Sequence, residues 1–289
     1  MPKIRRKIKV SPEDMQICIP SYKRYENISS PRSNSVTIKN LPRFMLPVTS
    51  LYVDKSEMDM YFRRIEGPRF GQISLKAAIN GIWGNIMDQI ISEATAETLI
   101  IMDDDLSFGI RRDLEHSPSK IEKDITDEEW MNAFLELAAL CEDYPLSSFQ
   151  YRQFCQGKTE RHACNQRMSM VWGLNTKFFQ ERRDTYNFSK LNYMSDYVFF
   201  MDLLNDGIEN RCINRITKND RPNAPGGIND AQPRDLEPFN RDVMAFAAMF
   251  PEYVSAYVKN NKSSWEDGHM GVRIQAARCL ADALKRKAI

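Results

Sequence analysis

The sequence lacks the features that would place the protein in a membrane or an oxidising compartment. Its six cysteines are scattered and form no Cys-x-x-Cys pair. No signal peptide is recognisable, and no apolar run is long enough to span a membrane. We therefore expect a cytoplasmic protein with reduced thiols and no membrane contact.

A strong imbalance of charge is also missing. Lys and Arg number 40 against 39 Asp and Glu, so the overall charge indicates no polyanionic partner. A local basic cluster at residues 3–9 is either a solvated tail or a contact for nucleic-acid phosphates. With 289 residues and 42% hydrophobic content, the chain can fill one large α/β domain, or a core domain with a smaller helical part.

Three consecutive acids are the most informative feature that is present. Asp103, Asp104 and Asp105 follow the apolar run 98–101, which is typical of a buried strand. Open α/β sheets bind ligands outside the carboxyl ends of their strands. Asp103 and Asp105 are two residues apart and would share one hard cation, Mn²⁺ or Mg²⁺, against a phosphate. Taken alone, the motif also fits a solvated sheet edge or a helix cap.

A second motif lies at the end of the first predicted strand. The run Met15 to Pro20 is apolar and ends in Ser21, Tyr22, Lys23 and Arg24. Proline and serine interrupt strand pairing, so the chain is expected to turn across the top of the sheet here.

The segments between these motifs predict a strand–helix order. A short strand is expected at residues 35–38, a strand at 48–53 and an amphipathic helix after it. One continuous helix is expected over residues 74–94, with Lys76 near its start. The charged residues 107–127 are typical of an inserted flap.

The second half predicts a strand at residues 167–174 and a helix over 192–204 with Asp196 in its first turn. A helix N-terminus stabilises a carboxylate there, although Asp196 is equally explained as an ordinary N-terminal acid. The last part, from about residue 240, is expected to be helical and contains His269.

The two motifs, Ile19 to Arg24 and Asp103 to Asp105, lie in an order that resembles nucleotide-sugar glycosyltransferases of the GT-A fold. The likeness covers about residues 15–210. It implies an α/β, Rossmann-like mixed sheet flanked by helices. Residues 1–239 would form the catalytic domain, and residues 240–289 a helical extension packed on the core.

The resemblance also implies roles for individual residues. The nucleoside-diphosphate sugar would be bound by Pro20, Ser21, Tyr22, Arg24, Lys76, Asp103 and Asp104. The metal ion, Mn²⁺ or Mg²⁺, would be held by Asp103, Asp105 and His269. In an inverting enzyme, Asp196 would be the base that deprotonates the acceptor hydroxyl.

The acceptor is less defined. The motif set is similar to that of bacteriophage enzymes that glycosylate hydroxymethylated pyrimidines in DNA. Basic clusters at residues 3–9, 111–112, 182–183 and 285–287 would then follow a duplex. The alternatives are a protein or polysaccharide acceptor, a sugar-phosphate nucleotidyltransferase, and a non-catalytic nucleic-acid-binding module. The absence of a Gly-rich loop after the first strand disfavours the nucleotidyltransferase.

Overall fold

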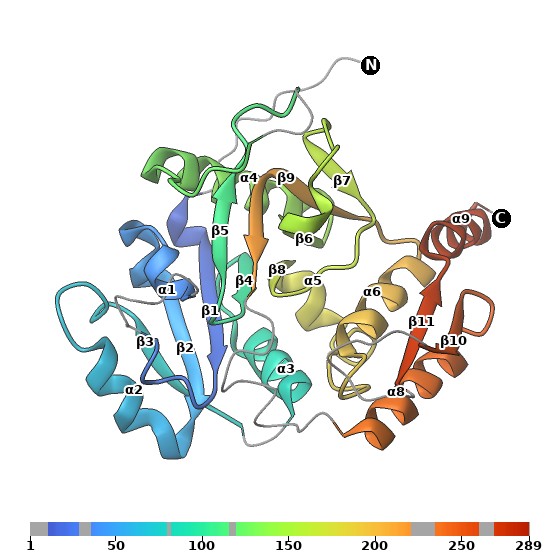
Figure 1. Ribbon diagram of the computed structural model, residues 1–289, viewed down its shortest axis with the longest axis horizontal. Coiled ribbons are helices and arrows are strands. Elements are labelled where there is room, and N and C mark those ends of the chain that lie inside the picture. Colours follow the sequence, from blue (N-terminus) through green and yellow to red (C-terminus); the bar gives the residue numbers. More distant parts are fainter. Residues whose placement is uncertain are drawn as a thin grey trace.

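A nine-stranded mixed sheet organises the chain, with helices on both of its faces (Figure 1). The computed structural model describes residues 11–28, 36–79, 82–115, 120–220, 235–259 and 269–288. The predicted basic arm at residues 3–9 therefore lies outside the described residues. The predicted α/β fold, a mixed sheet flanked by helices, is confirmed.

The sheet joins a parallel half to a mixed half. Its neighbouring strands, in spatial order, are β3 (Ser74–Ala78), β2 (Thr49–Asp54), β1 (Met15–Ser21), β4 (Thr98–Met102), β8 (Val171–Asn175), β6 (Leu146–Tyr151), β9 (Asn210–Asn219) and β5 (Ser107–Ile110), with β7 (His162–Cys164) paired to β9. The first four run parallel, and β8 is antiparallel to β4. The order β3-β2-β1-β4 creates a switch point at β1, where ligands of open α/β sheets bind.

Helices cover the two faces as separate layers. One face packs against α1 (Thr37–Asn40), α2 (Met58–Ile65) and α4 (Asp127–Asp143). The other packs against α3 (Trp83–Glu93), α5 (Thr176–Glu181) and α6 (Ser195–Asn205). Short 3₁₀ turns complete the connections: η1 (Pro12–Asp14), η2 (Arg43–Val48), η3 (Lys55–Glu57) and η4 (Arg152–Phe154). Because both faces are covered, β1 and β4 are apolar along almost their whole length.

Pro20 occupies a central strand without breaking it. The pairing of β1 with β4 ends at Cys18, opposite Ile101, whereas the pairing with β2 continues to Ser21. Beyond Cys18 the β4 side of β1 needs no N–H donor, so a proline is tolerated there. The strand therefore extends one residue beyond its predicted end, and Ser21 lies at the carboxyl edge of the sheet.

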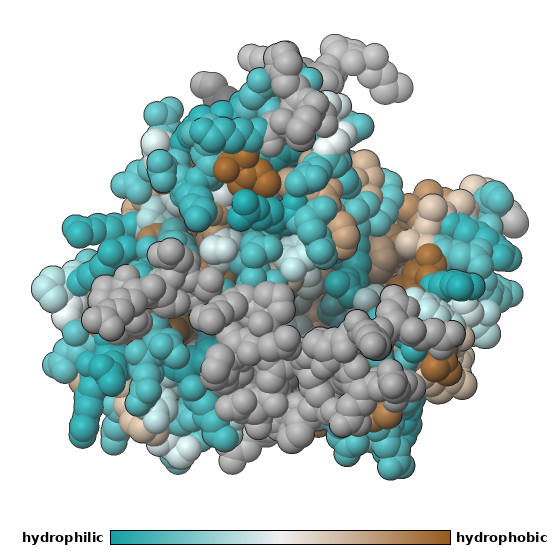
Figure 2. Space-filling view, viewed as in Figure 1, coloured by the Kyte–Doolittle hydropathy of each residue, from teal (hydrophilic) through white to brown (hydrophobic). Residues whose placement is uncertain are grey.

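The C-terminal part is mixed rather than wholly helical. It contains α8 (Leu236–Met249), the antiparallel pair β10 (Val254–Val258) and β11 (Met270–Ile274), and α9 (Ala276–Lys287). These elements and α6 share a third apolar core. Among the residues that Figure 2 colours, most are hydrophilic, and apolar residues gather at the right, over the C-terminal elements, with a smaller apolar patch near the upper centre.

Three local predictions are wrong. A strand was predicted at residues 35–38, but Thr37 and Ile38 lie in α1, where the Thr37 N–H donates to Asp104 O in the loop after β4. Lys76, predicted on a helix, lies in β3, where residues 74–78 pair with β2. The predicted flap begins with a core strand, β5, whose Phe108, Gly109 and Ile110 are buried. No helix in the described part of the chain is long and apolar enough to cross a membrane.

The contact between α3 and the segment before α6 generates a stability prediction. A Cβ atom on Gly84 would lie 2.3 Å from the backbone oxygen of Phe188. That backbone is fixed because its N–H donates to Asp88 of α3 at 2.7 Å. We expect Gly84→Ala to lower the free energy of unfolding by about 1–3 kcal/mol, the cost of overpacking. Urea unfolding measures it, with the exposed Ser92→Ala on the same helix as control; equal midpoints would contradict this packing.

Candidate active site

The three acids after β4 differ in how far they are buried. Asp104 is buried, with 6% of its surface exposed, whereas Asp103 and Asp105 are half-buried. The loop that carries them is held from both sides. The N–H of Asp103 donates to Met170 O at 2.8 Å, and the N–H of Thr37 donates to Asp104 O at 3.0 Å. The acids are thus positioned by fixed backbone, at the carboxyl end of β4.

Asp104 ties this loop to the end of β1. Its carboxylate accepts hydrogen bonds from the hydroxyl of Ser21 and from the guanidinium of Arg24. The same Arg24 nitrogen lies 2.9 Å from Asp105 Oδ2. Ser21 also bonds the Tyr61 hydroxyl of α2 at 2.7 Å. The two sequence motifs therefore meet in space. Arg24, which was predicted to contact the nucleotide sugar, forms ion pairs with Asp104 and Asp105.

Burial and mutual repulsion make the acids basic. Burial raises the pKa of Asp103 well above its ordinary value, and the charges of Asp105 and Asp104 raise it further. Burial raises the pKa of Asp104 to about 6, although Arg24 opposes the shift. The pKa of Asp105 is also raised by burial. An additional positive charge near these three acids would stabilise their ionised forms.

The turn after β1 carries Tyr22 next to Ser21, whose hydroxyl bonds Asp104. Lys23 has a φ of 53°, a left-handed conformation that few non-glycine residues adopt. It is held there because its N–H donates to Glu57 Oε2 at 2.9 Å and the next N–H, that of Arg24, donates to Tyr61 Oη at 3.1 Å. Tyr22 stays half-buried, with the Lys23 ammonium 5.1 Å from its ring centroid.

A buried lysine, not predicted from the sequence, lies beneath the acids. Lys218 of β9 is 2% exposed, and its ammonium donates to Ser148 Oγ at 2.6 Å and to Val171 O at 3.3 Å. Its charge lowers the pKa of Asp103. Lys218 reaches this position because the pairing of β6 with β9 skips three residues, from Phe149 opposite Ile213 to Gln150 opposite Thr217.

Asp196 lies in the first turn of α6, as predicted, and is linked to the acids through other side chains. Burial raises the pKa of Asp196, and Arg167, 3.8 Å away, lowers it. The charge of Arg167 also acts on Lys218 and on Tyr151. Arg167 therefore lies between the candidate base and the region of the acids. Its ring partner Tyr197, 4.2 Å from the guanidinium, fixes its position.

Tyr151 and Asp220 complete this neighbourhood. The Tyr151 hydroxyl bonds Asp220 Oδ1 at 2.9 Å. Burial and this bond raise the pKa of Tyr151 to about 12, so the hydroxyl stays protonated and donates. The charge of Asp220 in turn raises the pKa of Asp105. Neither residue was predicted, because a single Tyr or Asp at a strand end carries no recognisable motif.

Two predicted ligands are not brought into the site. Lys76 donates to Tyr52 Oη at 3.1 Å and lies 3.7 Å from Glu93 of α3, a placement that gives no support to the predicted donor contact. His269 is buried at the start of β11. Among the described residues, no three side chains of His, Cys, Asp or Glu are arranged to hold a metal. The predicted set of Asp103, Asp105 and His269 is therefore not assembled here, and metal dependence stays a prediction.

Several arginines of the predicted basic clusters contact other parts of the protein. Arg111 is 1% exposed and donates to Lys158 O at 2.7 Å. Arg112 pairs with Glu129 at 2.7 Å. Arg182 lies against Phe178, and Arg286 of α9 donates to Asn205 O at 2.8 Å. Of these arginines only Arg111 is buried, so the predicted contact of the basic clusters with DNA stays a prediction.

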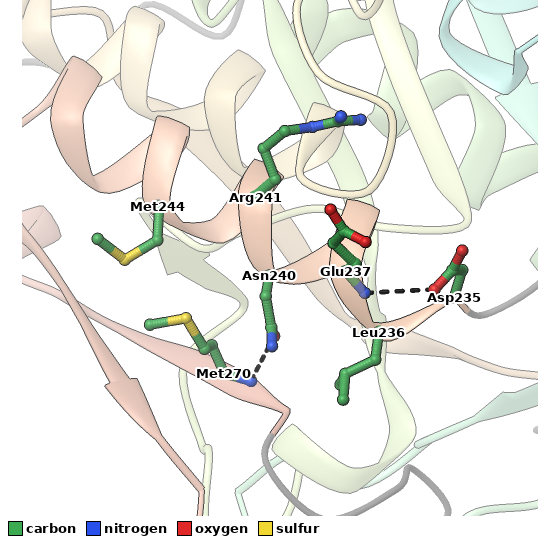
Figure 3. Close-up of a pocket in the computed structure, with 7 residues that line it drawn as sticks. All are labelled: Asp235, Leu236, Glu237, Asn240, Arg241, Met244 and Met270. Atoms are coloured by element: carbon green, nitrogen blue, oxygen red, sulfur yellow. Dashed lines mark hydrogen bonds between the residues drawn. The ribbon is translucent and has the colours of Figure 1, made fainter.

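A pocket of about 560 Å³ lies elsewhere, at the start of α8 (Figure 3). Asn240 closes one side of it through a bond to the Met270 N–H at 2.8 Å. Its lining residues are Asp235, Leu236, Glu237, Asn240, Arg241, Met244 and Met270. None of them belongs to the predicted site. The neighbouring Asp242 has a structural task, since its carboxylate accepts the N–H groups of Asn192 and Tyr193 ahead of α6.

Lys218 generates a prediction about pH. Burial lowers its pKa from 10.5 to about 8. Between these values the unfolded chain keeps a proton that the folded chain has lost, so this group's contribution to stability rises with pH. Replacing Lys218 with Met removes the cost of burying a charge, and this cost is larger at pH 7 than at pH 10. We therefore expect the free energy of unfolding of Lys218→Met, relative to the wild type, to be higher at pH 7 than at pH 10. The exposed Lys177→Met is the control. Urea unfolding at both pH values measures the difference, and an offset independent of pH would contradict the burial of the ammonium.

Comparison with solved structures agrees with the fold. The crystal structure of S. aureus TarS 1-349 in complex with UDP-GlcNAc matches with a TM-score of 0.52 and 12% sequence identity, over 94% of this chain and 72% of that one. The same S. aureus protein fragment in complex with UDP matches with a TM-score of 0.46 and 11% identity, over 94% and 71% of the two chains. A search of curated proteins finds no significant match.

Comparison with protein families identifies the chain. Residues 15–218 match the family described as TAGT, TET-Associated Glycosyltransferase. The matched region begins with β1 and ends at Lys218, so it contains the acids after β4, the Ser21–Arg24 turn and Asp196. It covers well over half of the chain and all strands of the central sheet. The protein therefore belongs to the family of TET-associated glycosyltransferases.

Proposed function

We propose that the protein transfers a sugar from a nucleoside-diphosphate sugar to a hydroxymethylated pyrimidine in DNA, with the help of Mn²⁺ or Mg²⁺. The observation that carries this proposal is the meeting of β1 and β4, where Ser21 and Arg24 contact Asp104 and leave Asp103 and Asp105 half-buried at the switch point of the sheet.

The donor is supported by the geometry of that edge. Tyr22, next to Ser21 in the turn after β1, offers a half-buried ring suited to stacking on a nucleobase. The proposed diphosphate would lie next to Asp103 and Asp105. TarS, which has a similar fold, binds UDP-GlcNAc. A uridine diphosphate sugar is therefore the first donor to test.

The side chains at this edge of the sheet are suitable ligands for a hard divalent cation. Asp103 and Asp105 supply carboxylate oxygens, the ligands that Mg²⁺ and Mn²⁺ prefer. Burial raises the pKa values of both carboxyl groups, and a bound cation would favour their ionised forms. Asp104 is already bonded to Ser21 and Arg24, so it supports the loop. When bound, the cation would stabilise negative charge on the leaving diphosphate.

Asp196 is the proposed base for the acceptor hydroxyl. Burial makes its carboxylate a better proton acceptor, while Arg167 keeps it ionised. As the hydroxyl oxygen attacks the sugar carbon, Asp196 would take the proton, and Arg167 would stabilise the carboxylate before the transfer. This role requires inversion at the sugar carbon.

The proposed acceptor is supported by the family to which the chain belongs more than by the geometry of the site. The family name associates these enzymes with TET, and a hydroxymethylated pyrimidine in DNA is compatible with that association. Protein or polysaccharide acceptors are the alternatives, since TarS and this chain share the fold only. Assays with hydroxymethylated oligonucleotides, hydroxylated peptides and glycans separate the three classes.

Metal dependence gives a first prediction. Changing a residue that only hydrogen-bonds a metal ligand typically lowers metal affinity or activity by about 10–100-fold. Asp105 is proposed to bind the metal directly, so Asp105→Asn should lower kcat/KM by more than about 100-fold. Calorimetric titration with UDP-GlcNAc should show that Mn²⁺ strengthens donor binding to the wild type and not to the variant. The exposed Asp59→Asn on α2 is the control. Donor affinity that is the same with Mn²⁺ and with EDTA would refute the metal site.

The base gives a second prediction. Asp196→Asn should lower kcat by about 10²–10⁴-fold, the usual contribution of a positioned base, with donor affinity unchanged. Asp127→Asn, an exposed acid in the first turn of α4, is the matched control. A variant that keeps its kcat, or a product with the anomeric configuration of the donor, would remove Asp196 from this role.

A further inference from the structure

A pair of aromatic residues, one exposed and one half-buried, follows β6. Phe154, in η4 directly after β6, has 52% of its surface exposed, and Tyr151 is half-buried. Its ring centroid lies 5.6 Å from that of Tyr151, at an interplanar angle of 61°. The pair therefore presents a π surface at the end of β6.

Tyr151 connects this surface to the reacting groups. Its hydroxyl donates to Asp220, whose charge acts on Asp105. On its other side, the charge of Arg167 acts on Tyr151, and Arg167 pairs with Asp196 at 3.8 Å. Because β8 is antiparallel to both β4 and β6, the carboxyl ends of β4 and β6 lie at the same edge of the sheet, so Tyr151 and the acids share that edge. An acceptor hydroxyl must reach this region to meet the donor sugar and Asp196.

An exposed basic side chain close to the pair favours a polyanion over a neutral sugar. Of the basic residues that follow Tyr151, Arg161 is paired with Glu136 at 2.7 Å and Arg167 with Asp196 at 3.8 Å. Arg152, two residues from Phe154, is exposed. Basic residues beside an exposed aromatic ring are the combination that binds nucleic-acid backbone and stacks on bases.

Resting on the proposed glycosyltransferase function, we propose that Phe154 and Tyr151 form the acceptor site, on which one base of a DNA strand stacks after leaving the helix. Arg152 binds a flanking phosphate. Enzymes that modify a base take it out of the stack, because the target atom is otherwise inaccessible. Stacking on Phe154 holds such a base next to Tyr151, and its hydroxymethyl group lies toward Asp196.

The test compares Phe154→Ala with Phe154→Trp and with Phe62→Ala, a change of an equally exposed Phe on α2, with 55% of its surface exposed. The acceptor is an oligonucleotide with one 5-hydroxymethylcytosine, and the donor is UDP-GlcNAc with Mn²⁺. We expect Phe154→Ala to lower kcat/KM for the oligonucleotide by about 5- to 150-fold, the effect of losing one stacked base. Phe154→Trp should retain transfer, and Phe62→Ala should match the wild type.

Two further readouts separate this proposal from the proposed function. Hydrolysis of the donor without acceptor reports the glycosyltransferase chemistry and should be equal in all variants. Fluorescence of 2-aminopurine at the target position reports base binding without any donor, and should change with the wild type and not with Phe154→Ala. Equal transfer and equal fluorescence for wild type and Phe154→Ala would overturn the proposal. So would donor hydrolysis with transfer only to a hydroxylated peptide or a glycan.

Discussion

The contact of Arg24 with Asp104 and Asp105 is the constraint on which the site depends. Three carboxylates in succession repel one another, and burial makes their ionisation costly. Arg24 from the end of β1 compensates two of them, and Lys218 acts on the third from below. Removing one partner of a buried ion pair typically costs about 3–5 kcal/mol, so this charge arrangement holds the turn after β1 against the loop after β4.

The halves of the sheet contribute different parts of the proposed chemistry. The parallel strands β1 and β4 supply the acids and the turn with Tyr22, which suits a donor. The other strands, β6, β8 and β9, supply Tyr151, Met170 next to Asp103, and Lys218. Two residues with left-handed backbone conformations, Lys23 and Met170, lie where these parts meet. Strain of this kind persists only where the surrounding structure fixes it, as hydrogen bonds do here.

Much of this arrangement could be predicted because it depends on local patterns. The apolar runs before Pro20 and before Asp103 predicted β1 and β4, and the capped α4 and the placement of Asp196 followed from helical spacing. Lys76 was misplaced because the segment 74–78 has residues that suit a helix, and only pairing with β2 makes it a strand. Similarly, five residues at 254–258 form a strand only through their partner at 270–274.

The remaining site residues depend on contacts that no local pattern encodes. Lys218 faces the acids because of an irregular register in β9, and Arg167 reaches Asp196 from a loop 29 positions earlier. The pair Arg111 and Arg112 was read as a surface cluster, yet one of the two is buried. Burial of a charged residue is decided by the partners it meets, and these come from distant segments.

The central claim is that this family member transfers sugar from a nucleoside diphosphate to a hydroxymethylated base. It is tested most directly by incubating the full chain with Mn²⁺, a panel of nucleotide sugars and an oligonucleotide that contains 5-hydroxymethylcytosine, followed by intact-mass spectrometry. The account predicts an added mass of one sugar on the hydroxymethylated strand and none on its unmodified counterpart. An unchanged mass of the hydroxymethylated strand with every nucleotide sugar would contradict it.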